Sequence, residues 1–208
     1  LMAKMEEFDD DGDMGPIANR LFVAWINARR ASGAPPRATI EKLVWWIEHD
    51  DYGLAYEIER GDVIGALDTA ALDILGQTAR EKLAGATQIA EERERRSFEN
   101  TWRPILRAVL VAQRNVAEFV AAADRDGLTP GDCEPIADML ASEGKRTEAL
   151  AWVEKGLSLK SEKRTLGISD DLGALQRRLL LELGRTGDAL ASAWAAFVDG
   201  PWEHRYDD

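Results

Sequence analysis

The sequence predicts an all-α protein whose C-terminal part is an array of helix hairpins. Three observations lead to this fold class. Apolar residues recur at helical spacing through most of the chain, the alternation typical of half-buried strands is missing from the sequence, and one block repeats at an offset of 40 residues. The chain has 208 residues, 45% of them hydrophobic, which is enough for one domain or two small ones around a sizeable core.

The first helices are expected before residue 90. Gly15-Pro16 opens the first one, because a proline in the first turn removes no hydrogen bond, and the Ser-Gly-Ala-Pro-Pro segment at 32–36 ends it. Thr39 is expected to cap the second helix, and Asp62 to cap a third that continues to about Leu83. Apolar residues of the second helix follow at i, i+3, i+4 and i+7: Ile40, Leu43, Val44 and Ile47.

A charged helix is expected next, around residues 91–96 (Glu-Glu-Arg-Glu-Arg-Arg). Opposite charges three and four positions apart stabilise an exposed helix. Equal numbers of glutamates and arginines, with no aromatic residues between them, argue against RNA binding here. Thr101 and Pro104 are expected to restart the helical pattern, Asn115 to interrupt it briefly, and residues 160–169 to form the longest late connection.

Composition and charge suggest three regions and exclude several classes of function. Residues 1–13 hold six acidic residues and one lysine, which predicts a disordered, acidic lead-in. Residues 14–100 are the N-terminal helical region, and 101–208 are the repeat region. The formal net charge of −12 makes direct nucleic-acid binding unfavourable. Because no stretch approaches the roughly 18 apolar residues of a membrane span and no secretion signal is visible, we expect a cytoplasmic protein without membrane contact.

The repeat places residues 139–151 over residues 179–191 without a gap. Gly144 and Gly184 are predicted to adopt the positive φ that ends a first helix and begins a tight turn. A fainter copy 30 residues earlier aligns Arg114 with Gly144. A single hairpin cannot bury its own apolar face, so the pattern predicts that hairpins stack on one another.

Small and large apolar residues of the repeat have separate expected roles. Ala149 and Ala189 are small where the second helix must approach the first, and Gly156 and Ala196, seven residues further on, keep the same face shallow. The leucines expected to fill the seam between the helices are Leu140, Leu150, Leu180 and Leu190.

These residues resemble tetratricopeptide-type repeats over residues 105–199. The match is to the second half of that motif, namely the glycine–acidic–alanine–leucine turn and the small residue seven positions later. Cys133, Ala137 and Arg177 stand where the motif has its first-helix tryptophan and leucine-glycine pair, so the repeats are degenerate. The offset of 40 also exceeds the usual period of about 34.

The segment from Glu148 to Gly156, with the Leu-Gly-Arg-Thr-Gly-Asp-Ala-Leu block at 183–190, is also similar to an uncharacterised family of bacterial helical proteins. It further resembles the helical tails found beside SWIM-type zinc fingers. The zinc motif of three cysteines and a histidine does not occur in this sequence. The resemblance implies a helical scaffold and supplies no catalytic residue.

The candidate catalytic motifs are incomplete. His49-Asp50 is the dipeptide of HD-type metal phosphohydrolases, but those enzymes need further histidines and the chain has only His204 besides. Cys133 is the single cysteine, and we expect a buried, inert thiol. The Gly-Lys-Arg-Thr segment that begins at Gly144 lacks the earlier glycine of a phosphate loop, and no G-x-S-x-G elbow occurs. We therefore expect no enzyme, no metal and no cofactor.

The predicted function is a non-enzymatic protein–protein interaction scaffold that binds a protein or peptide segment. Trp45 and Trp46 are adjacent and cannot both face one side of a helix, so one of them is expected at the surface as an aromatic anchor. The alternative function, implied by the SWIM resemblance, is an accessory or regulatory helical domain of a larger DNA-associated protein, SWIM-type or ATPase-linked. The repeat alignment predicts the residues that face a partner groove: Glu134, Asp138, Arg178 and Glu182.

Overall fold

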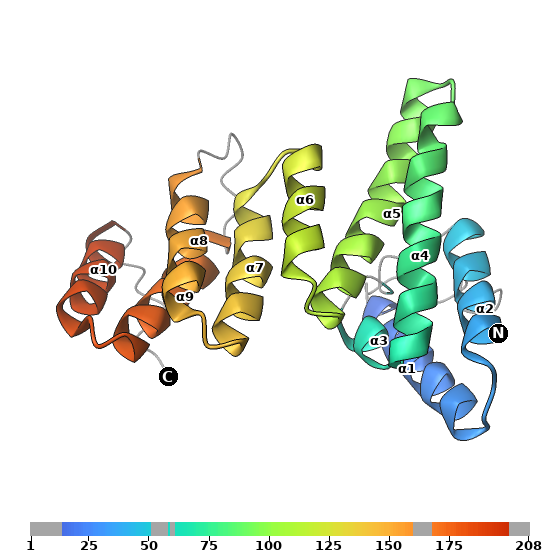
Figure 1. The fold of residues 1–208 in the computed structure, drawn as a ribbon, viewed down its shortest axis with the longest axis horizontal. Helices are drawn as coiled ribbons and strands as arrows, with labels where there is room; N and C mark the ends of the chain where they lie inside the picture. The colour runs from blue at the N-terminus through green and yellow to red at the C-terminus, as the bar shows by residue number, and fades with distance from the viewer. Residues whose placement is uncertain (1–13, 51–57, 59–60, 160–167, 200–208) are drawn as a thin grey trace. The chain divides into compact units, whose positions relative to one another are not determined.

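The computed structural model describes residues 14–50, 58, 61–159 and 168–199. This described part of the chain is all-α and contains ten α-helices, as the sequence predicts (Figure 1). The helices belong to two compact units, Leu1–Asn115 (unit 1) and Val116–Asp208 (unit 2). The predicted acidic lead-in at residues 1–13 lies outside the described residues.

Unit 1 begins with α1 (Met14–Ala31) and α2 (Pro36–Glu48). The prediction that Thr39 caps the second helix is wrong. The helix begins at Pro36, because the fixed φ of proline suits the first helical position, and Pro35 is the capping residue. Thr39 is instead buried one turn inside α2, where its Oγ1 accepts a hydrogen bond of 2.9 Å from Nε of Arg29 on α1.

The predicted helix from Asp62 to about Leu83 is in fact two helices, α3 (Gly61–Gly65) and α4 (Thr69–Gly85). Asp68 caps α4, since its Oδ1 accepts a 2.9 Å hydrogen bond from the backbone N–H of Ala71. Asp62 lies in the first turn of α3. The spacing of apolar residues does not reveal the break between α3 and α4, because the buried residues keep helical spacing across it: Ile64, Leu67, Ala71 and Leu75.

A short 3-10 helix, η3 (Ala86–Gln88), precedes α5 (Glu92–Ala112), the last helix of unit 1. The prediction that Thr101 and Pro104 start a new helix is wrong, because α5 is continuous and contains Pro104. One face of α5 is buried and packs on α4 and η3, which offsets the hydrogen bond that proline removes. The predicted boundary between residues 100 and 101 falls inside this helix, and the division into units follows Asn115. The buried residues of α5 are Trp102, Ile105, Leu106, Val109 and Leu110.

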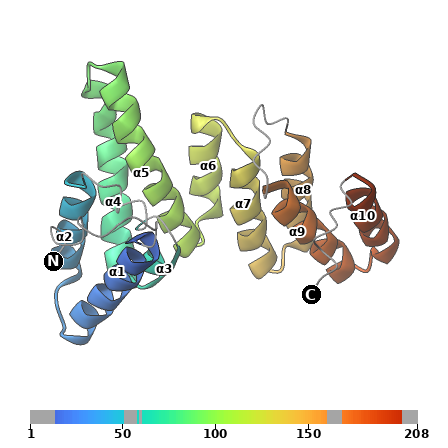
Figure 2. The ribbon, with the colours of Figure 1, turned by 180° about the vertical axis from the view of Figure 1, so that it is seen from behind.

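In its described residues, unit 2 has a single helix, α6 (Val116–Asp126), followed by two helix hairpins (Figures 1 and 2). The hairpins are α7 (Pro130–Ser142) with α8 (Arg146–Ser158), and α9 (Ile168–Glu182) with α10 (Thr186–Asp199). The α7–α8 hairpin contacts the α9–α10 hairpin through both of its helices, since α9 packs on α7 and on α8. Residues 160–167 of the predicted connection at 160–169 lie outside the described residues. The remaining two residues belong to α9, which begins at Ile168.

The two hairpin turns have the same backbone geometry, as the repeat predicts. Gly144 has φ +79° and Gly184 has φ +74°. In each turn the residue after the glycine donates a hydrogen bond to the leucine carbonyl five residues back, at 3.0 Å for Lys145 and 2.8 Å for Arg185. The turn at Arg114 repeats this pattern with φ +54° at a non-glycine residue, so the fainter copy of the repeat is confirmed at the level of its turn.

The seam of the first hairpin is tightly packed. A Cβ at Gly156 would lie 2.8 Å from Cβ of Cys133 on α7 and 3.0 Å from Cδ1 of Leu172 on α9. The expected need for a small residue is therefore confirmed here. The equivalent expectation fails on α10, where Ala196 and Leu190 are both exposed, because no described helix covers that face.

Candidate partner groove

The first helices of the two hairpins, α7 and α9, form an open groove of about 250 Å³ on the surface of unit 2. The repeat explains which residues meet across it. Asp138 and Arg178 are 40 residues apart, which is the repeat offset, so they occupy the same position on successive first helices. The lining residues are Glu134 and Asp138 from α7, with Asp171, Ala174, Leu175 and Arg178 from α9.

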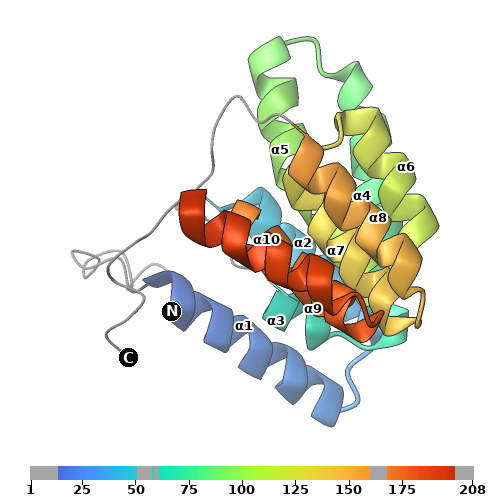
Figure 3. The same cartoon turned by 90° about the vertical axis from the view of Figure 1, so that its left-hand side faces the viewer.

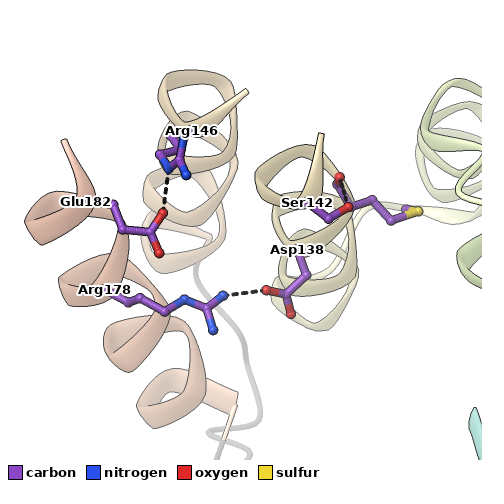
Figure 4. A network of polar contacts seen from close by, with 6 residues as sticks. Asp138, Ser142, Arg146, Arg178 and Glu182 are labelled. Atoms are coloured by element: carbon purple, nitrogen blue, oxygen red, sulfur yellow. Dashed lines mark hydrogen bonds and ion pairs between the residues drawn. The ribbon is translucent and has the colours of Figure 1, made fainter. Parts of the chain in front are cut away.

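Two exposed ion pairs connect α9 to the preceding hairpin (Figure 4). Arg178 donates a 2.8 Å hydrogen bond to Oδ1 of Asp138 on α7. Nε of Arg146, at the start of α8, donates to Oε2 of Glu182 at 2.6 Å. Because exposed ion pairs contribute only about 0–1 kcal/mol to stability, these pairs can be exchanged without unfolding the hairpins.

The structure brings three of the four predicted groove residues together. Glu134, Asp138 and Arg178 line the groove, whereas Glu182 lies one turn beyond Arg178 on α9 and pairs with Arg146. Sequence reasoning missed Asp171, which lies seven residues before Arg178 and whose equivalent at the offset of 40 is Gly131.

The groove has a negative electrostatic character. It holds three carboxylates, on Glu134, Asp138 and Asp171, and one guanidinium, on Arg178. The pKa of Glu134 is raised above its ordinary value, mainly because its carboxyl is partly buried and further because Asp171 and Asp138 repel its negative charge. Since Arg178 already neutralises Asp138, the remaining pair of carboxylates favours a cationic ligand.

Cys133 is fully buried on α7, next in sequence to the groove residue Glu134. A capping box formed by Thr129 and Asp132 begins the helix, and the Cys133 thiol is 3.6 Å from the carbonyl oxygen of Thr129. Burial raises the pKa of the thiol; the nearby Lys155 lowers it, and Asp132 raises it further. A buried thiol with a raised pKa is a weak nucleophile, so Cys133 acts as a packing residue against Gly156.

The two adjacent tryptophans of α2 lie in different surroundings, because neighbouring residues of a helix point to different sides. Trp46 packs inside unit 1, with ring centroids 5.2 Å from Phe22 and 4.7 Å from Trp25. Trp45 is exposed, and its ring stacks on His49 at 4.7 Å. Its role as an anchor stays a prediction.

The histidines of the sequence do not form a site in the described residues. Nδ1 of His49 is 2.8 Å from the carbonyl oxygen of Trp45, to which it donates, and its ring stacks on the same tryptophan. His204 lies outside the described residues. Within residues 14–50, 58, 61–159 and 168–199, no group of three histidine, cysteine or acidic residues is placed to hold a metal ion.

The fold and the groove define an all-α protein with an acidic surface groove between successive helix hairpins. Comparison with known proteins found no matching family model, no matching curated protein and no matching solved structure. None of the helices in the described segments has the length and apolar character needed to cross a lipid bilayer.

Proposed function

We propose that this protein is a non-enzymatic interaction scaffold in which a tetratricopeptide-like array in unit 2 binds a partner polypeptide along the α7–α9 groove. The observation that carries the proposal is the groove itself. Equivalent positions of successive first helices bring Asp138 and Arg178 to within 2.8 Å of each other on an open surface. The shared turns at Gly144 and Gly184 support the array arrangement.

The chemistry of the groove favours a basic segment as the partner. Its volume of about 250 Å³ falls below the range of about 300–1,000 Å³ that is typical of small-molecule pockets, so it suits a side chain better than a cofactor. A lysine or arginine can place its charge between Glu134 and Asp171 while its methylene stem covers Ala174. The pKa of Glu134 is raised mainly by partial burial and further by Asp171 and Asp138, and a bound cation would offset this second contribution.

The test is the binding of a fluorescein-labelled peptide of alternating lysine and alanine, followed by fluorescence anisotropy at about 0.15 M and 0.5 M salt. We expect the double variant Glu134→Lys with Asp171→Lys to bind at least about tenfold more weakly than the wild type, because two attractive charges become repulsive. The matched control is Asp124→Lys with Glu154→Lys, which makes the same change of charge at exposed positions of α6 and α8. Equal losses in both double variants would show that binding follows net charge and would overturn the proposal.

A charge exchange refines the assignment of Asp138 and Arg178. The double variant Asp138→Arg with Arg178→Asp keeps the net charge and the ion pair between α7 and α9. Because the pair is exposed, the melting temperature should stay nearly unchanged. Peptide binding should weaken, since the positive charge moves to the side of the groove that carries Glu134. Unchanged binding would remove these two residues from the partner surface.

A further inference from the structure

Helix α10, whose backbone is labelled in Figure 3, carries exposed apolar side chains that form a stripe. Its members are 45% to 70% exposed. Their spacing of i, i+4, i+7 and i+8 places them on one face of the helix. Surface patches of this kind on a folded chain mark interaction sites more often than scattered single residues do. We name this the α10 stripe: Leu190, Trp194, Phe197 and Val198.

The preceding hairpin shows what normally covers such a face. Leu150 on α8, the repeat equivalent of Leu190, is only 3% exposed. α8 contacts both α7 and α9, and Gly156 approaches Leu172 of α9 closely. In a stacked array of hairpins, an outer face that no neighbour covers is polar where the array is soluble alone. α10 has an apolar face instead, so its surface is built for a further contact.

The charge distribution favours a second copy of the chain as that contact. A chain with net charge −12 repels its own copy. The ten residues from Ala189 to Val198, however, contain no ionisable side chain. The nearest acidic residue toward the N-terminus, Asp188, is already neutralised by Arg185 at 2.7 Å. Two identical α10 stripes can therefore meet without placing like charges against each other within this stretch, and Asp199 follows it only at the end of α10.

The geometry of the stripe suits an antiparallel pair of helices. Leu190, Trp194 and Phe197 are separated by four and then three residues, which is the spacing of a helix–helix seam. Trp194 and Phe197 have ring centroids 5.6 Å apart, so they form one continuous aromatic surface. In an antiparallel pair the two helix dipoles also point in opposite directions, which is electrostatically favourable.

The stripe supplies part of the area that a dimer requires. A stable interface buries about 800 Å² on each partner, and one aromatic side chain supplies about 150–250 Å² of that when it is fully buried. The stripe has two aromatic and two large aliphatic side chains, each exposed to 45% or more. They supply a large share of the area, and flanking residues of α9 and α10 can supply the rest.

We infer that the protein forms a homodimer in which the α10 stripe packs antiparallel on the α10 stripe of a second copy. The contact is isologous, because the same residues serve on both copies. The stripe shares no residue with the α7–α9 groove, so each dimer presents two grooves. Two grooves on one particle raise the affinity for a partner with repeated basic segments, through effective concentration.

Sedimentation equilibrium of the full chain between about 1 and 100 µM tests the dimer. We expect a mass twice that of the 23.0 kDa chain at the upper end. Trp194→Glu should restore the monomer, because it buries two facing charges in an isologous contact. Trp45→Glu is the matched control, since it makes the same change at an exposed tryptophan of unit 1 and should leave the dimer intact. Far-UV circular dichroism of both variants should equal that of the wild type.

Disulfide trapping tests the antiparallel arrangement separately. The variant Leu190→Cys, mixed with Val198→Cys and oxidised, should form a mixed disulfide more readily than either variant alone, while the buried Cys133 stays reduced. A chain that is monomeric at 100 µM, because another segment or a different partner covers the stripe, overturns the inference. So does a dimer that Trp194→Glu leaves unchanged.

Discussion

The hairpins α7–α8 and α9–α10 share one sequence block, yet they bury it very differently. Their turns are nearly identical, with φ +79° at Gly144 and +74° at Gly184. Leu150 is 3% exposed in the first hairpin, whereas the equivalent Leu190 is 70% exposed in the second. The comparison shows that the repeat determines the turn by itself, while burial depends on which element packs against the hairpin.

The largest expected difference between the hairpins lies in their seam leucines. Leu150→Ala should lower the free energy of unfolding by about 3 kcal/mol, because it opens a cavity in a packed site. Leu190→Ala should change it by about 0.5 kcal/mol or less, because the side chain is exposed. Urea unfolding at a concentration that keeps the chain monomeric measures both. Equal losses would show that α10 is covered in the monomer.

The small residues of the second helices should show the same contrast at a smaller scale. Gly156→Val should destabilise the fold by about 2 kcal/mol, because even its Cβ would lie 2.8 Å from Cβ of Cys133. Ala196→Val, at the equivalent exposed position, should cost no more than about 0.7 kcal/mol from helix propensity. Thermal unfolding monitored by circular dichroism separates the two. If Gly156→Val destabilises the fold no more than Ala196→Val does, the helices can move apart at the seam without loss of stability.

Substitutions in the turns should have similar effects in the two hairpins and little net effect at Arg114. Gly144→Ala and Gly184→Ala should each destabilise by about 1 kcal/mol, since L side chains are strained at positive φ. Arg114→Gly relieves that strain at φ +54° but increases the freedom of the unfolded chain, so its net effect should lie within about 0.5 kcal/mol of zero. Chemical denaturation of the three variants tests this, and a large loss for Arg114→Gly would indicate that the arginine side chain itself stabilises the turn.

The smallest expected effect is the pH dependence of stability that Glu134 contributes. It distinguishes the groove from the exposed carboxylates elsewhere in unit 2. Because the pKa of Glu134 is raised in the folded protein, the folded state holds this proton more tightly than the unfolded state. Stability should therefore fall slightly as pH rises from about 4, the ordinary range of glutamate, through the raised pKa. Glu134→Gln removes this loss, so the variant should gain stability relative to the wild type at neutral pH and not at pH 3.

Unfolding curves across this pH range measure the gain of Glu134→Gln. Glu154→Gln, at an exposed position of α8, is the matched control. A gain of equal size in both variants, or a gain that persists at pH 3, would contradict the link to the groove.

Much of the local structure could be predicted from the sequence. The helix spacing of α1, the glycine turns at Gly144 and Gly184, and the equivalence of Asp138 and Arg178 all follow from residues close together in the chain or from the repeat offset. These features depend on hydrogen bonds within about six residues, or on a register that the alignment itself contains.

Only the tertiary structure decided the features that depend on distant neighbours. Thr39 is a buried partner of Arg29 rather than a cap, and α5 continues through Pro104 because α4 and η3 pack along it. Asp171 joins the groove although its equivalent at the repeat offset is Gly131. Leu190 is exposed although Leu150, its equivalent in the repeat, is buried. A repeat pattern specifies which face of a helix is apolar, but it cannot specify whether another helix covers that face.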